Sequence, residues 1–187
     1  RKQFSAFIIF FNSTKVIDKS GSTVVNFIIV YSFVHLIMQT IIQQLEKIIT
    51  DYTPQLKQLD EADFADKPSP VKWSGKEYLG HLIDSAQNNI RRFVVARHED
   101  KPFIVYAQNN WVIAAGYQNY PLKDLIELWI LINKHLVIVL KNIPESDLDR
   151  EVQTQELHSI QWLAADYNKH LLHHLHQVLH LEPVPYP

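Results

Sequence analysis

Asp166-Tyr167-Asn168-Lys169-His170-Leu171-Leu172-His173-His174-Leu175-His176 is a histidine-rich stretch near the end of this 187-residue chain. It lies inside a longer run, about 159–181, in which apolar residues recur at steps of three and four. That spacing predicts an amphipathic helix. The predicted apolar stripe consists of Ile160, Leu163, Ala164, Tyr167, Leu171, Leu175, Val178 and Leu181.

Helical direction divides the histidines of this run into two groups. His170 and His174 fall at the edge of the apolar stripe, one turn apart. The other group is predicted to face water, and its members are His158, His173, His176 and His180. Two imidazoles at positions i and i+4 can point at one metal ion. The inward pair is therefore a candidate pair of metal ligands, and the alternative is a surface or capping cluster.

Composition limits the classes of function. The chain is 47% hydrophobic, enough for a real core, and its 18 basic and 20 acidic residues give no nucleic-acid footprint. It contains no cysteine, which excludes disulfides and thiolate metal sites, so any metal needs nitrogen and oxygen ligands. The four glycines form no phosphate-binding loop. We expect a cytoplasmic protein that binds neither nucleic acid nor membrane.

The first 37 residues differ in pattern from the rest. They contain two apolar runs, Phe4–Phe11 and Val24–Met38, each shorter than the roughly 20 residues of a spanning helix. A regular amphipathic pattern begins at Met38, which is the only methionine. Our hypothesis is that residues 1–37 are an N-terminal extension outside the native domain, which would comprise residues 38–187. The alternative is a tail, or an added helix or strand.

Four long segments carry the helical pattern. Ser74 and Glu77 form a capping box at the start of the second segment. The third segment is apolar almost all round, which indicates a central position or an oligomer interface. No convincing pair of strands appears in the connections. The pattern predicts an all-α four-helix bundle. The predicted helices cover about residues 38–59, 74–97, 121–142 and 159–181.

The second predicted helix offers a third metal ligand. His81, Ser85, Asn88 and Arg92 lie on one polar stripe of this helix. A neutral imidazole binds a borderline divalent ion at about 2.0–2.1 Å, and three protein ligands leave a coordination position open for water or substrate. The alternative is that His81 is a solvated residue on a solvated face.

Two motifs resemble those of the DinB-like superfamily. The segment from Trp73 to Asp84 is similar to the pattern W-S-x-x-E-x-x-x-H-L-x-D, and the segment 166–177 resembles the closing H-x-x-x-H helix. The resemblance covers roughly residues 38–182. It implies an up-down-down-up four-helix bundle. It also implies a metal triad of His81, His170 and His174.

The resemblance implies more than one activity, because family members include metal-dependent hydrolases and thiol S-transferases such as the bacillithiol transferases. We expect a divalent metal, Zn or Ni, that acts on water or on the thiol of a small-molecule cosubstrate. Since the chain has no cysteine, such a thiol must arrive with the substrate. The alternative is a non-catalytic, metal- or ligand-binding helical bundle. We expect a homodimer in either case.

Five further residues are candidates for the surroundings of the metal. Asp166 precedes His170 by one turn and could orient its second ring nitrogen, and Asp84 is similarly placed relative to His81. The alternative is that both are ordinary surface acids. The other candidates, for the pocket or for contact with an anionic substrate group, are Tyr78, Asn88 and Arg92.

Overall fold

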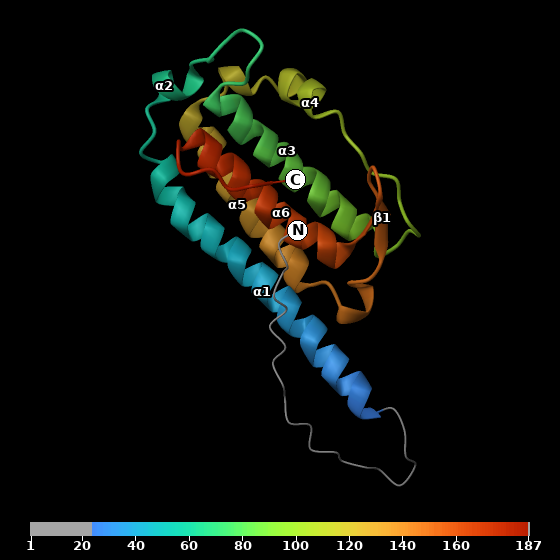
Figure 1. Cartoon of the computed structure of the whole chain (residues 1–187). Helices are drawn as coiled ribbons and strands as arrows, with labels where there is room; N and C mark the ends of the chain where they lie inside the picture. The colour runs from blue at the N-terminus through green and yellow to red at the C-terminus, as the bar shows by residue number, and fades with distance from the viewer. Residues whose placement is uncertain (1–23, 187) are drawn as a thin grey trace, which may run out of the picture.

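Four long helices form a bundle (Figure 1). The computed structural model describes residues 24–186, with side chains from residue 35 onward. The predicted all-α four-helix bundle is confirmed. Among the described residues, none of the helices combines the length and apolarity needed to cross a membrane. The long helices are α1 (Val24–Leu56), α3 (Gly75–Val95), α5 (Leu122–Lys141) and α6 (Ile160–Val178).

The connections contain short elements that the sequence pattern does not reveal. The expected absence of a strand pair is wrong, because β1 and β2 form an antiparallel hairpin in which Val152 pairs with His158. Strands of three residues are too short to show an alternating pattern, and burial of Val152 stabilises them. The short elements are α2 (Glu61–Ala65), α4 (Gln108–Ala115), η1 (Tyr117–Asn119), η2 (Glu145–Asp147), β1 (Glu151–Gln153) and β2 (Leu157–Ser159).

The core lies where the four helices meet. α3 packs against α5 and α6, and α1 packs against the other side of the same two helices. One fully buried side chain from each helix illustrates this centre: Leu45, Leu82, Trp129 and Leu171. Burial of such side chains from water stabilises the bundle by roughly 1.5–3 kcal/mol each.

Contacts at one end of the bundle relate the helix directions. The Tyr52 hydroxyl lies 2.6 Å from His176 Nε2, so the C-terminal ends of α1 and α6 lie together. Lys57 forms an ion pair with Glu127, which brings the start of α5 to the same end. The tip of α1 is followed by α2 and by the start of α3 (Figure 1). These contacts are compatible with the predicted up-down-down-up order.

The first helix begins earlier than the sequence pattern indicates. α1 starts at Val24, not at Met38, because the apolar run before Met38 contains no residue that stops a helix. Ile37 and Met38 nevertheless stand at the edge of the packed core. The hypothesis of an extension over residues 1–37 falls largely on residues 1–23, which lie outside the described residues, and it stays a prediction.

The start of α3 is set by its cap. Ser74 Oγ accepts a hydrogen bond from the Glu77 amide, and the Glu77 carboxylate accepts one from the Ser74 amide, as the predicted capping box requires. One turn further on, the Tyr117 ring lies directly against Gly80, where a Cβ atom would come within 2.1 Å of it. This close approach docks η1 on α3, and the Tyr117 hydroxyl donates to Asp84 Oδ1 at 2.6 Å.

Asp84 is a buried carboxyl group whose charge opposes folding. It is 1% exposed, and its pKa is raised from 3.8 to about 6. Burial is the cause of the increase, and the hydrogen bond from Tyr117 offsets part of it. Because the folded-state pKa lies above the unfolded-state value, the protonated group favours the native state. That stabilisation is complete below the unfolded-state pKa and is lost as the pH rises through about 6.

Asp84→Asn should remove this titration and keep an acceptor for Tyr117. We expect the free energy of unfolding of the variant, relative to the wild type, to rise by about 2 kcal/mol between about pH 4.5 and about pH 7.5. Urea unfolding at the two pH values measures it. The exposed Asp149→Asn is the matched control, and an equal difference at both pH values would contradict the assignment.

Candidate metal centre

α3 and α6 bring the three predicted histidines together. His81 comes from α3, and His170 and His174 come from successive turns of α6. The Nε2 atoms of His81 and His170 are 3.1 Å apart, and each of the three residues offers a ring nitrogen within 4.8 Å of the others. Within residues 24–186, this is the one group of three or more histidines or acids that meets this condition.

The separation of the nitrogens fits a shared ion. Two nitrogens bound to one ion at about 2.0–2.1 Å lie about 2.9–3.4 Å apart for bond angles of about 90–109°. The observed 3.1 Å between His81 and His170 falls in that interval. Three imidazoles form a donor set of borderline softness, which suits zinc, nickel and other late divalent ions.

Burial keeps these imidazoles neutral. Together with a smaller effect of the neighbouring His174, it lowers the pKa of His81 to about 4. Burial is also the main cause that lowers the pKa of His170 and of His174. Since a metal ligand must present an unprotonated nitrogen, the cluster is in its binding form at neutral pH.

The second ring nitrogen of each histidine has its own surroundings. His174 Nδ1 donates to Gln177 Oε1 at 3.1 Å, which leaves Nε2 of His174 with the lone pair. Gln177 in turn donates to the Tyr78 hydroxyl at 2.9 Å. His170 Nδ1 lies 3.4 Å from Ser85 Oγ. His81 Nδ1 is buried without a hydrogen-bond partner among the described residues.

The two predicted orienting carboxylates have other partners. Asp84 accepts from Tyr117, and Asp166 Oδ2 accepts from the Tyr186 hydroxyl at 2.9 Å, so neither forms a hydrogen bond with a ligand histidine. The prediction that they orient His81 and His170 is therefore wrong for this structure. Both tyrosines lie outside the four long helices, and helix periodicity carries no information on them. Gln177 could have been found, because it follows His174 by three residues on the same helix face.

The histidines predicted to face water are also placed differently. His173 and His176 are half-buried, because the residues that follow α6, which we call the C-terminal tail (residues 179–186), cross this side of the helix. His158 is half-buried and stacks on Trp162 with ring centroids 3.7 Å apart. His180 is exposed, as predicted. A helix side that is polar in sequence can thus be covered by a non-helical segment, whose position the helical periodicity does not predict.

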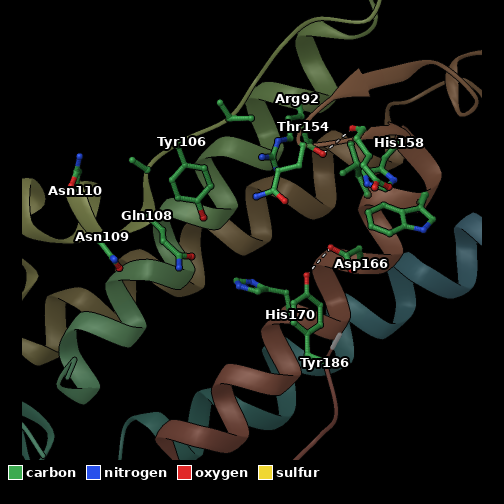
Figure 2. A pocket seen from close by; sticks show the side chains of 16 residues that line it. Arg92, Tyr106, Gln108, Asn109, Asn110, Thr154, His158, Asp166, His170 and Tyr186 are labelled. Atoms are coloured by element: carbon green, nitrogen blue, oxygen red, sulfur yellow. Dashed lines mark hydrogen bonds between the residues drawn. The ribbon is translucent and has the colours of Figure 1, made fainter. Parts of the chain in front are cut away.

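A cavity of about 1050 Å³ opens beside His170 (Figure 2). Its walls come from α3, residues 105–110, the β-hairpin and α6, and Tyr186 closes one side. Arg92 and Asp166 line it, whereas Asn88 is buried and donates to the Asp84 backbone carbonyl. Tyr78 instead lines a separate cavity of about 650 Å³.

Arg92 is held rigidly in the cavity wall. Its Nε and Nη2 atoms both donate to the Ile104 carbonyl at 3.2 Å, and Nη1 donates to Asn89 Oδ1 at 3.3 Å. Arg92 forms no ion pair with any residue of the described part of the chain. Its positive charge is therefore available to a ligand in the cavity.

Known proteins that are similar to this chain in sequence carry the name of metal-dependent hydrolases. A protein of Halalkalibacterium halodurans named "Putative metal-dependent hydrolase BH0277" is 26% identical over 120 residues, 63% of this chain and 70% of that protein. A "Putative metal-dependent hydrolase" of Bacillus cereus is 25% identical over 146 residues, 77% of this chain and 83% of that protein.

Solved structures show the same fold at lower identity. YfiT from Bacillus subtilis, described as "a probable metal-dependent hydrolase with an unusual four-helix bundle topology", superposes with a TM-score of 0.68 at 16% identity over 91% of both chains. The mycothiol-dependent maleylpyruvate isomerase superposes with a TM-score of 0.64 at 16% identity, over 74% of this chain and 59% of the isomerase. The model of the DinB superfamily matches residues 44–178. This chain therefore belongs to the DinB superfamily.

Proposed function

We propose that this protein is a divalent-metal-dependent enzyme in which His81, His170 and His174 hold the ion. The observation that carries the proposal is the convergence of three neutral imidazoles from two helices, with two Nε2 atoms 3.1 Å apart. Burying polar groups is costly unless they have partners, and a shared ion would satisfy these nitrogens. Zinc and nickel are the ions that we favour, because the donors are all nitrogen.

The residues around the centre would determine what it does. A divalent ion at three imidazoles supplies Lewis acidity, which lowers the pKa of a bound water or thiol. Gln177 and Ser85 orient the imidazoles of His174 and His170. The cavity beside His170 would admit a small polar molecule, and Arg92 would provide a fixed positive charge in its wall.

Two chemistries are supported by different relatives. The names of the similar bacterial proteins support a hydrolase that activates water. The fold shared with a mycothiol-dependent isomerase supports a transferase that uses a low-molecular-weight thiol. In the second case the sulfur would come with the cosubstrate, because this chain has no cysteine.

A non-catalytic, metal- or ligand-binding homodimer is the alternative from another class. α5 has apolar side chains on its outer side: Leu131 is 62% exposed and Ile138 is 56% exposed. Two exposed apolar side chains that lie two turns apart on one helix support self-association through α5. Such a dimer would be compatible with the enzyme as well, so metal content and turnover decide between the two.

Cobalt substitution separates the two chemistries. Protein loaded with Co²⁺ is mixed with N-acetylcysteine and its absorption spectrum recorded. A sulfur-to-cobalt charge-transfer band that is absent from His170→Ala assigns the site to thiol chemistry. Chelator-sensitive hydrolysis of ester or amide substrates without that band assigns it to water activation. If metal is bound and neither signal is observed, the result favours the non-catalytic bundle.

Removal of one ligand should release the metal. We expect about one Zn²⁺ or Ni²⁺ per wild-type chain, and loss of the ion from His170→Ala because two imidazoles rarely hold a divalent ion. Elemental analysis of the purified, metal-loaded proteins measures the content. His98→Ala, an exposed histidine away from the cluster, is the matched control. Full metal content in a variant that lacks all three histidines would defeat the assignment.

Gln177→Leu should weaken metal binding without abolishing it. The substitution removes the acceptor for His174 Nδ1, which frees the ring to rotate and lowers the basicity of its other nitrogen. We expect the dissociation constant for Zn²⁺ to rise about 10–100-fold, as for other partners of metal-bound histidines. Competition with a zinc indicator measures it. Gln87→Leu, exposed on α3, is the control, and equal affinities would exclude this role.

A further inference from the structure

The C-terminal tail is attached to α6 by the two histidines of this helix that lie outside the three-histidine cluster. His176 Nδ1 donates to the Glu182 carbonyl at 2.6 Å, and His173 Nδ1 donates to the Val184 carbonyl at 2.8 Å. His176 Nε2 accepts from the Tyr52 hydroxyl on α1, which fixes the orientation of its ring. These bonds direct the tail back along the helix toward His170.

Tyr186 is the residue that this tail delivers to the centre. Its ring packs edge-on against His170 with centroids 5.5 Å apart, and its hydroxyl points at Asp166 (Figure 2). The Tyr186 hydroxyl donates a hydrogen bond to Asp166 Oδ2 at 2.9 Å. The tail therefore holds the Asp166 side chain in one orientation.

A small chamber of about 140 Å³ adjoins His170 and contains opposite charges that do not pair. Arg92 and Asp166 both line it, together with Tyr106 and Tyr186, yet within the described part of the chain no ion pair joins the two charged groups. Arg92 uses three of its five N–H groups on Ile104 and Asn89. Asp166 Oδ1 has no hydrogen-bond partner among residues 24–186.

These unused groups define the ligand chemistry. A carboxylate would be attracted by Arg92 and repelled by Asp166, and an ammonium group would experience the reverse. A neutral group with one acceptor and one donor would satisfy both sides without adding charge to the chamber. An amide is a group of this kind that presents its acceptor and its donor on two separate atoms, since its carbonyl accepts and its N–H donates.

We propose that this chamber is an amide-recognition subsite: the substrate's amide carbonyl accepts from Arg92, its N–H donates to Asp166, and Tyr186 of the C-terminal tail is the positioning residue for Asp166. The inference rests on the proposed function, because it is the ligand role of His170 that puts a bound amide beside the reacting centre. It narrows the substrate class, for hydrolase and transferase alike, to small molecules that contain an amide.

Small probes test the subsite by binding alone. Zinc-loaded protein is titrated with N-methylacetamide, acetate and methylammonium, and the dissociation constants are measured by NMR from the Arg92 side-chain N–H signals and the backbone amides. We expect N-methylacetamide to bind most tightly. Arg92→Lys should weaken it about tenfold, because a lysine cannot present the same fixed fork. The neighbouring exposed Arg91→Lys should leave the affinity unchanged.

Two further variants test the charge and the tail. Asp166→Asn keeps an acceptor for Tyr186 and removes the negative charge, so acetate should bind more tightly than it does to the wild type. Tyr186→Phe keeps the ring against His170 but loses the bond to Asp166. Its metal content should be unchanged and its amide affinity lower by about threefold to tenfold. Tyr120→Phe, in which the altered tyrosine lies outside the chamber, is the matched control.

The outcomes separate this inference from the proposed function. Metal content is measured on every sample, and a wild type that binds no metal would overturn the proposed function. A normal metal content, combined with an affinity for N-methylacetamide that is the same in Arg92→Lys, Tyr186→Phe and the wild type, would overturn the amide subsite. Tighter, Arg92-dependent binding of acetate than of N-methylacetamide to the wild type would also overturn it, in favour of an anion site.

Discussion

The packing of α3 against α6 is the constraint on which the site depends. Leu82 and Leu171 are fully buried in the core that joins these helices, and they fix the register at which His81 meets His170 and His174. Because protein interiors are close-packed, the helices cannot slide to relieve the contact between the imidazoles. The cluster is therefore held by the hydrophobic core rather than by its own polar interactions.

The cap of α3 contributes to the same register. Ser74 and Glu77 define where the helix begins, two turns before His81. The Tyr117 ring packs against Gly80 and covers this part of the helix. The ring nitrogens pay a desolvation cost for this burial, which is also what keeps them neutral and able to bind a metal. The buried surface that stabilises the bundle thus also keeps the imidazoles able to bind a metal.

α6 serves two purposes on two faces. His170 and His174 turn toward α3, while His173 and His176 hold the carbonyls of the C-terminal tail. The four histidines share one short stretch of sequence, and a helix of 3.6 residues per turn sends them to different surroundings. The tail in turn brings Tyr186 to the cavity, so both groups of histidines contribute to the region around the candidate metal centre.

Periodicity and local signals were sufficient for much of this protein. The four-helix bundle, the capping box at Ser74 and the inward direction of His170 and His174 follow from the repeat of a helix, which each segment expresses by itself. His81 was weaker, because one histidine on a polar stripe has no partner in its own helix. The resemblance to a family strengthened its choice as the third ligand.

What remained depended on segments that meet only in the folded chain. The partners of Asp84 and Asp166 are Tyr117 and Tyr186, which lie in a short 3₁₀ turn and in the tail and carry no periodic signal. The β-hairpin is stabilised by burial of Val152, and its three-residue strands are too short to show an alternating pattern in the sequence. The sequence by itself determined the helices and the faces they bury, because these are properties of neighbouring residues. Only the tertiary structure decided which side chains complete the cavity, because those contacts join residues far apart in the chain.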